Sequence, residues 1–231
     1  MRASDPAVHP LAVHPSAGRG TLANVTAPSP ALLAAPSTDV LGAAGVPASV
    51  TASDRDAAAG AADWLDREQQ DRWSRLQRAK DRDDFLAARI AADAVVRRLL
   101  PDSPALPARL TFVQRCESCG GPHGRPRLPG IPLAVSWAHA RGWVIAAAHR
   151  GERLGVDIDL LDAHAPIADS SPVSGRHFVR AEALVKAGAY DLDTALETAL
   201  DWPESQDHRH RGLLVRDLQW PGGLIGALAC D

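Results

Sequence analysis

The 231-residue sequence has few cysteines, no excess of basic residues and no long apolar run. Its three cysteines are an odd number and too few for a disulfide scaffold, which fits a reducing compartment. The formal net charge of −3 provides no broadly basic surface, so nucleic acid is not an expected partner. No apolar stretch approaches the roughly 18–20 residues of a membrane span, and the N-terminus lacks the pattern of a signal peptide. We therefore expect a soluble, cytoplasmic protein without membrane association.

Residues 1–46 lack aromatic side chains altogether and are rich in Ala, Pro, Ser, Thr and Gly. Such a segment buries too little apolar surface to offset the entropy of ordering it. We expect residues 1–46 to form a low-complexity, mostly disordered extension, with residues 21–25 as a candidate strand. The remaining chain is long enough to bury a sizeable core.

The segment Gly155-Val156-Asp157-Ile158-Asp159 alternates apolar and acidic residues. A period of two predicts a strand with the aliphatic side chains on one face and both carboxylates on the other. Two adjacent carboxylates repel each other, and a hard cation such as Mg²⁺, which takes oxygen ligands, relieves that repulsion. Taken alone the pair is a weak signal, because a solvated strand end has the same pattern.

Phe178, Glu182 and Lys186 are spaced by four and so share one face of a predicted helix. A third carboxylate and an ammonium could therefore face the acidic pair, which suggests a metal-assisted site for a phosphorylated substrate. The alternative is an ordinary surface pair of Glu182 with Lys186, worth only ~0.2–0.5 kcal/mol.

Cys116 and Cys119, followed by His123, have part of the spacing of a zinc site. A structural zinc ion normally takes four ligands, and the only other cysteine is Cys230. We interpret this segment as a turn in which a metal is optional, and not primarily as a metal site. It leads into Gly124-Arg125-Pro126, a rigid loop that presents one guanidinium.

Residues 83–100 predict an amphipathic helix, and residues 133–135 and 143–148 predict a hairpin. Arg89 projects from the apolar face of the helix, where it either pairs with Asp93 or binds a phosphate. Shorter elements are expected at residues 50–53 (strand), 64–80 (helix), 213–218 (strand) and 223–229 (strand).

In this order the motifs resemble the 4′-phosphopantetheinyl transferases of the Sfp (surfactin-synthetase-activating) type, especially actinobacterial members. That family carries Gly-Val/Ile-Asp-Ile/Val-Glu on a strand and Trp-x-x-Lys-Glu-x-x-x-Lys on a helix, like residues 155–159 and 178–186. Residues 123–126 look like its His-Gly-Lys/Arg-Pro segment, and residues 135–142 like its Ser-x-Ser-His-x-x-Gly segment. Four motifs in the family's order are far more specific than any one of them.

The resemblance implies an α+β fold made of two similar halves, residues 47–150 and 151–231, related by a pseudo-twofold axis. Each half would be a small antiparallel sheet packed on a helix, with the active site in the cleft between them. The implied activity is Mg²⁺-dependent transfer of 4′-phosphopantetheine from coenzyme A to a serine of an apo acyl or peptidyl carrier protein of fatty-acid, polyketide or nonribosomal peptide synthesis. A monomer is expected.

The resemblance also implies roles for individual residues. Asp157, Asp159 and Glu182 would bind the metal, and Glu182, Asp157 and Lys186 would be catalytic, with Glu182 or a water that it orients acting as the base. Lys186, Arg82, Arg125 and His139 would bind coenzyme A, with Arg82 near the 3′-phosphate and Arg125 near the nucleotide.

Four positions depart from the family pattern. Asp159 replaces Glu, Phe178 replaces Trp, Ala181 replaces Lys and Ala138 replaces Ser. The segment between Asp159 and Glu182 is also shorter than usual, which affects the surface that selects the carrier protein. The Asp-x-Asp pattern leaves open a glycosyltransferase that binds a metal–diphosphate. The substitutions at Ala138, Asp159 and Ala181 leave open a non-catalytic relative that binds coenzyme A or a carrier protein.

Overall fold

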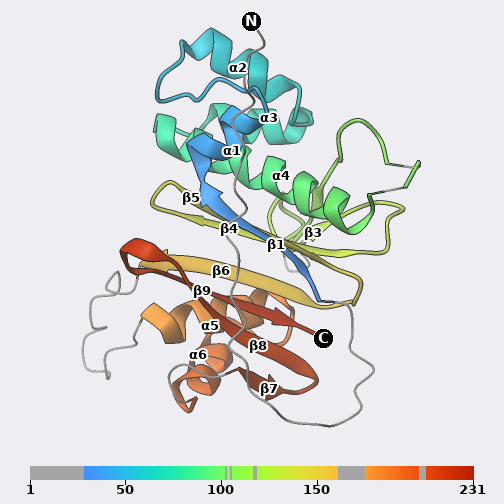
Figure 1. Ribbon diagram of the computed structural model, residues 1–231, viewed down its shortest axis with the longest axis vertical. Coiled ribbons are helices and arrows are strands. Elements are labelled where there is room, and N and C mark those ends of the chain that lie inside the picture. Colours follow the sequence, from blue (N-terminus) through green and yellow to red (C-terminus); the bar gives the residue numbers. More distant parts are fainter. Residues whose placement is uncertain (1–28, 102, 105, 117–118, 161–174, 203–206) are drawn as a thin grey trace, which may run out of the picture.

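Two antiparallel sheets lie face to face in the computed structural model, with helices on both outer sides (Figure 1). The structure describes residues 29–101, 103–104, 106–116, 119–160, 175–202 and 207–231. The helices are α1 (Ser37–Ala43), α2 (Asp54–Ala62), α3 (Arg67–Ser74), α4 (Ala79–Leu99), α5 (Gly175–Lys186) and α6 (Leu192–Leu200). The strands are β1 (Ala31–Pro36), β2 (Val113–Gln114), β3 (Pro126–Arg127), β4 (Ala134–Ala140), β5 (Trp143–His149), β6 (Leu154–Leu160), β7 (His208–His210), β8 (Leu213–Gln219) and β9 (Leu224–Cys230), with a 3-10 turn at Pro221–Gly223. The predicted α+β class is confirmed.

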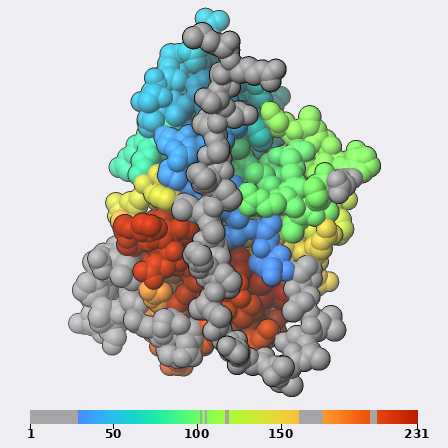
Figure 2. Space-filling view, in the orientation of Figure 1, coloured from blue at the N-terminus to red at the C-terminus, as the bar shows by residue number. Residues whose placement is uncertain are grey.

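Each sheet has its own helical cover. The first sheet has the strand order β1-β5-β4, and α4 packs on its outer face. The second has the order β6-β9-β8-β7, with α5 and α6 on its outer face. A small third sheet joins β2 to β3. The space-filling view shows the blue-to-green N-terminal part and the orange-to-red C-terminal part as separate regions that meet across the molecule (Figure 2).

A third apolar core lies between the two sheets. It includes Val156 and Ile158 of β6, Ile145 of β5 and Leu228 of β9. The hydroxyl of Ser136 in β4 accepts a hydrogen bond from the backbone N–H of Val156 at 3.1 Å, which ties the two sheets together. The strand predicted from the alternation of residues 155–159 is confirmed, because its aliphatic residues enter this core.

The expected extension is wrong for residues 29–46. Residues 31–36 form β1, which pairs with β5 along its whole length, and Leu41 of α1 is fully buried. Successive side chains of β1 pack into two different cores, Leu33 against α4 and Leu32 toward the second sheet. The segment needs no aromatic residue, because its neighbours provide apolar surface on both faces. Residues 1–28, including the candidate strand at 21–25, lie outside the described residues.

Most of the other expected elements are present with shifted ends. The helix expected at 83–100 begins earlier, at Ala79, and the hairpin strands β4 and β5 are longer than expected. The helix expected at 64–80 ends at Ser74, and residues 75–78 separate it from α4. The strand expected at 50–53 is wrong, since these residues form a turn. Within the described part of the chain, no helix has the length and apolarity needed to cross a membrane.

Candidate active site

Helix α5 lies unusually close to strand β6. A Cβ atom added to Gly155 would lie 1.9 Å from the carbonyl oxygen of Ala183, so a larger residue could not occupy this position. Gly155 and Asp157 lie on the face of β6 opposite to Val156 and Ile158, which enter the inter-sheet core. The glycine thus lets the helix approach the strand face that carries the carboxylates.

Asp157 and Lys186 form the central contact of this interface. The Nζ atom of Lys186 donates to Oδ1 of Asp157 at 2.6 Å, and Asp157 is only 7% exposed. Burial raises the pKa of Asp157, Lys186 lowers it through charge and hydrogen bonding, and the charge of Glu182 raises it. The net direction is upward, so one ammonium does not fully compensate for burying this carboxylate beside another.

Glu182 and Asp159 lie beside this pair and are less buried. Glu182 is one helical turn before Lys186, and both residues are half-buried. Asp159 accepts a hydrogen bond from the backbone N–H of Leu160 at 2.8 Å. The predicted helix and the predicted facing of Lys186 toward Asp157 are therefore present in the structure.

The three carboxylates offer the oxygen donors that Mg²⁺ prefers. Among the described residues, the one group of three His, Cys, Asp or Glu donors within 4.8 Å of one another lies elsewhere, at Cys116, Cys119 and His123. The oxygens of Asp157, Asp159 and Glu182 are therefore more widely spaced than a completed metal site. The donor chemistry fits a hard cation, because a buried carboxylate with a raised pKa lies near a second carboxylate.

A cavity of about 280 Å³ opens beside Lys186. Arg125 and Trp137 line it together with Lys186, so two cations and an aromatic ring face the same space. The guanidinium of Arg125 donates to the carbonyl oxygen of Ala187 at 3.1 Å, which joins the loop before β3 to the end of α5. Two parts of the chain that are far apart in sequence thus supply positive charge to one cavity.

His139 lies at the outer end of β4, and its side chain is 44% exposed. Its Nδ1 atom is 3.9 Å from Oδ2 of Asp84, a buried carboxylate that accepts a hydrogen bond from the hydroxyl of Ser37. Partial burial lowers the pKa of His139, Asp84 opposes this, and Lys186 adds to the lowering. The imidazole of His139 is therefore mostly neutral at pH 7. The positive charge of Lys186, which contacts Asp157, contributes to the lowered pKa.

Arg82 does not line the cavity beside Lys186. Its Nη2 atom is 2.9 Å from Oδ1 of Asp54, and its guanidinium lies 5.6 Å from the ring centre of Trp73. These contacts place Arg82 among α2, α3 and α4. The structure brings Asp157, Glu182 and Lys186 together with Arg125, but holds Arg82 at another surface.

Arg89 does not form the pair with Asp93 that its spacing suggests. Asp93 instead accepts hydrogen bonds from Arg97 and from the backbone N–H of Leu110. The guanidinium carbon of Arg89 lies 3.3 Å from the ring centre of Phe85. The same guanidinium donates a hydrogen bond to the side-chain oxygen of Gln114. Burial lowers its pKa to about 9, with the charge of Arg72 adding to the effect.

Two residues of this region were not anticipated. Asp84 faces His139, and Gln114 lines the cavity and donates to the carbonyl oxygen of Gly124 at 2.8 Å. The adjacent acids Asp83 and Asp84 at the start of an apolar helix could have indicated buried, hydrogen-bonded carboxylates. Asp83 accepts hydrogen bonds from two backbone N–H groups of the 49–50 turn. No sequence pattern pointed to Gln114.

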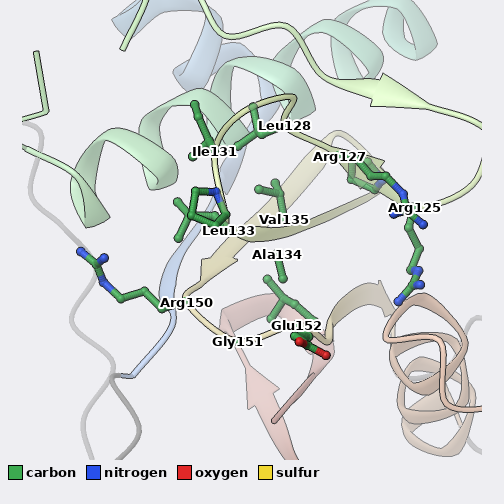
Figure 3. Close-up of a pocket in the computed structure, with 13 residues that line it drawn as sticks. Arg125, Arg127, Leu128, Ile131, Leu133, Ala134, Val135, Arg150, Gly151 and Glu152 are labelled. Atoms are coloured by element: carbon green, nitrogen blue, oxygen red, sulfur yellow. The ribbon is translucent and has the colours of Figure 1, made fainter. Parts of the chain in front are cut away.

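A larger cavity of about 540 Å³ lies on the other side of Arg125. Figure 3 shows Arg125 and Arg127 together at one end and Arg150 at the opposite end, with Glu152 below. Neither Asp157 nor Lys186 lines it. Its arginines suit an anion, but the acidic residues of the candidate site do not reach it, so we place the candidate chemistry at the smaller cavity.

In comparisons with known proteins, no family model and no curated protein matches the chain.

Proposed function

We propose that this protein transfers 4′-phosphopantetheine from coenzyme A to a serine of an apo acyl or peptidyl carrier protein. The observation that carries the proposal is the 2.6 Å contact of Lys186 with buried Asp157, which lies beside Glu182 and next to the cavity lined by Arg125. Clustered carboxylates next to cations suit a substrate that arrives as a phosphate with a divalent metal.

The carboxylates and the ammonium have separate roles in this proposal. Asp157, Asp159 and Glu182 would hold Mg²⁺, which would supply positive charge against the leaving phosphate. Glu182 accepts the proton of the attacking serine hydroxyl, directly or through a water. Lys186 exchanges Asp157 for a phosphate oxygen and acts there as a point charge.

Two arginines and one histidine bind the nucleotide end of coenzyme A. Arg125, already fixed against α5, faces the cavity beside Lys186. His139, neutral at pH 7, donates a hydrogen bond to a phosphate oxygen. Arg82 would reach the 3′-phosphate only by leaving Asp54, an exposed partner whose loss costs little.

The proposal includes the arrangement that the resemblance implies. The two halves, each a sheet covered by a helix, are related by a pseudo-twofold axis, with β1 now part of the first half. Coenzyme A binds between the halves of a cytoplasmic monomer. The glycosyltransferase alternative loses support, because the described sheets are antiparallel and lack the alternating parallel βα units of a nucleotide-binding domain.

A second candidate function is binding of coenzyme A or a carrier protein without transfer. The wide spacing of the three carboxylates favours it, as do Ala138 and Ala181 at positions where the resembled family has Ser and Lys.

The deciding experiment is intact-mass spectrometry of several apo carrier proteins incubated with the protein, coenzyme A and Mg²⁺. We expect at least one carrier to gain the mass of one phosphopantetheine group, and a metal chelator to prevent the gain. Glu182→Gln should slow it about 10²–10⁴-fold, whereas Glu197→Gln, which changes an exposed carboxylate on α6, should not. Coenzyme A binding without transfer to any carrier would instead establish the binding-only function.

A further inference from the structure

Three soft ligands converge in the loop that leads to Arg125. The Sγ atoms of Cys116 and Cys119 and a ring nitrogen of His123 all lie within 4.8 Å of one another. The Sγ atom of Cys119 lies 3.0 Å from Nε2 of His123. Cys119 and His123 are exposed and Cys116 is half-buried, so solutes can reach the group.

The backbone of this loop holds the ligands in place. The backbone N–H of Cys116 donates to the carbonyl oxygen of Gly121 at 2.9 Å. The backbone N–H of Gly120 donates to the carbonyl oxygen of Cys116, also at 2.9 Å. Gly120 has a φ of +67°, a conformation that favours glycine. These bonds link Cys116 to Gly120 and Gly121, next to Cys119 in the chain.

The same turn prepares Cys119 as a ligand. The backbone N–H of Gly121 donates to Sγ of Cys119 at 3.4 Å, which helps to fix the position of the sulfur atom. A Cβ atom at position 121 would lie 3.1–3.2 Å from the ring of His123 and from Sγ of Cys119. Glycine at this position therefore leaves the space around the two ligands open.

We propose that Cys116, Cys119 and His123 bind one zinc ion. Two thiolates and an imidazole are ligands that Zn²⁺ prefers, and tetrahedral Zn–S and Zn–N bonds place such atoms roughly 3.5–4 Å apart. The present spacing needs only a small adjustment to reach that geometry. Among the described residues no fourth Cys, His, Asp or Glu joins the group, so water completes the tetrahedron. Binding transfers the thiol protons to solvent, and no group is oxidised or reduced.

The zinc ion would brace the loop from which Arg125 projects. The loop is already held on one side by Arg72 of α3, which donates to the carbonyl oxygen of Pro122 at 3.0 Å. On the other side Arg125 donates to Ala187 of α5. The metal therefore has a positioning role for Arg125. The inference does not rest on the proposed function, because metal binding is measured without coenzyme A or a carrier protein.

The test uses the full chain, purified with a non-chelating reductant. We expect elemental analysis to find about one zinc per chain, because three protein ligands and one water make up a single tetrahedral site. Replacement by Co²⁺ should give an intense sulfur-to-cobalt absorption band that zinc then removes. Cys116→Ser, Cys119→Ser and His123→Ala should each weaken binding by at least about 100-fold, since even the partners of metal ligands change affinity 10–100-fold.

Cys230→Ala is the matched control, because Cys230 is the third cysteine, buried in β9. It should keep the metal and the cobalt band. Circular dichroism of every variant separates loss of the ligand from loss of the fold, and metal loss from a folded Cys119→Ser protein supports the site. A reduced protein that binds no metal, a cobalt spectrum without the sulfur band, or full metal retention by Cys119→Ser would overturn the proposal. So would a Cys116–Cys119 disulfide that persists in the reductant.

Discussion

Helix α5 forms ion pairs with two carboxylates of the second sheet, Asp217 of β8 and Asp157 of β6, and these two contacts differ in burial and in hydrogen bonding. Arg180 is fully buried and contacts Asp217 of β8 with two hydrogen bonds, at 2.8 and 2.7 Å. Arg176 adds a third at 3.3 Å. Lys186, by contrast, offers a single 2.6 Å hydrogen bond to Asp157 of β6, and its side chain remains 29% exposed.

The difference separates a structural contact from a site that can exchange partners. The fork of Arg180 matches both oxygens of Asp217 and so satisfies a buried charge. Asp157 has a raised pKa despite its ammonium partner, since burial and the charge of Glu182 outweigh that single contact. A phosphate or a metal ion could therefore compete for Lys186 or Asp157, whereas nothing comparable would displace Arg180.

The largest effect should come from Glu182→Gln, which keeps the shape of the side chain but removes its charge and basicity. If Glu182 is metal ligand and base, the turnover number should fall about 10²–10⁴-fold, the range for loss of general acid–base catalysis. Steady-state kinetics with coenzyme A and a saturating carrier protein measures this. Thermal unfolding should change little, because Glu182 is half-buried. A Glu182→Gln variant with the wild-type turnover number would show that Glu182 is not part of the catalytic site.

Arg180→Met should have the next largest effect, and it should fall on stability. Removing Arg180 leaves Asp217, whose side chain is only 13% exposed, with the longer contact to Arg176, and loss of a partner from a buried pair costs about 3–5 kcal/mol. Urea unfolding followed by circular dichroism gives the change in the free energy of unfolding. The double variant Arg180→Met/Asp217→Leu should recover part of the loss. A single variant within about 1 kcal/mol of wild type would mean that this pair resembles an exposed one.

Lys186→Ala should mainly weaken the binding of coenzyme A. A hydrogen bond to a charged group contributes about 1.5–3 kcal/mol, so the KM for coenzyme A should rise about 10- to 100-fold. Because a phosphate is present in ground and transition states alike, the turnover number should fall by no more than KM rises. Lys80→Ala serves as the control ammonium on α4. An unchanged KM in Lys186→Ala would remove Lys186 from the substrate site.

Asp157→Asn should give the smallest change in stability, and its sign is informative. The pKa of Asp157 in the folded protein lies above its ordinary value of 3.8, so ionisation opposes folding. Wild-type stability should therefore fall as the pH rises from about 3.8 through the folded-state pKa, an effect that the amide lacks. We expect the thermal midpoint of apo Asp157→Asn at neutral pH to equal or exceed that of wild type, while transfer is lost. A clear drop in the midpoint would mean that Lys186 overcompensates for burial.

Strand β6 and helix α5 were predictable because local patterns encode them. The alternation of Val156 and Ile158 with Asp157 predicts a strand with one apolar face, and the structure buries that face between the sheets. The four-residue spacing of Glu182 and Lys186 predicts a shared helical face. Strand β1 was not predictable in this way, since it has no alternation of apolar and polar residues and it pairs with β5, which lies far along the chain.

The candidate site was only partly predictable. Lys186 is spaced to pair with Glu182, yet its hydrogen bond is with Asp157 on another element. Arg82 was chosen by position along the chain, and the structure engages it with Asp54 instead. Cys116 and Cys119 could be counted from the sequence, but their convergence with His123 depends on the folded loop.

The sequence by itself determined the sidedness of individual strands and helices. It indicated which residues of a strand point to the core, which residues share one side of a helix, and where the apolar segments end. Periodicity encodes these choices, because strand and helix geometry fix the direction of each side chain. Only the tertiary structure decided which charges meet. Arg97 donates a hydrogen bond to Asp93, and Lys186 donates one to Asp157. The guanidinium of Arg89 lies over the ring of Phe85. Which charged residues form a pair depends on distances of a few ångströms between elements and on how deeply each group is buried. The spacing of residues along the sequence determines neither of these quantities.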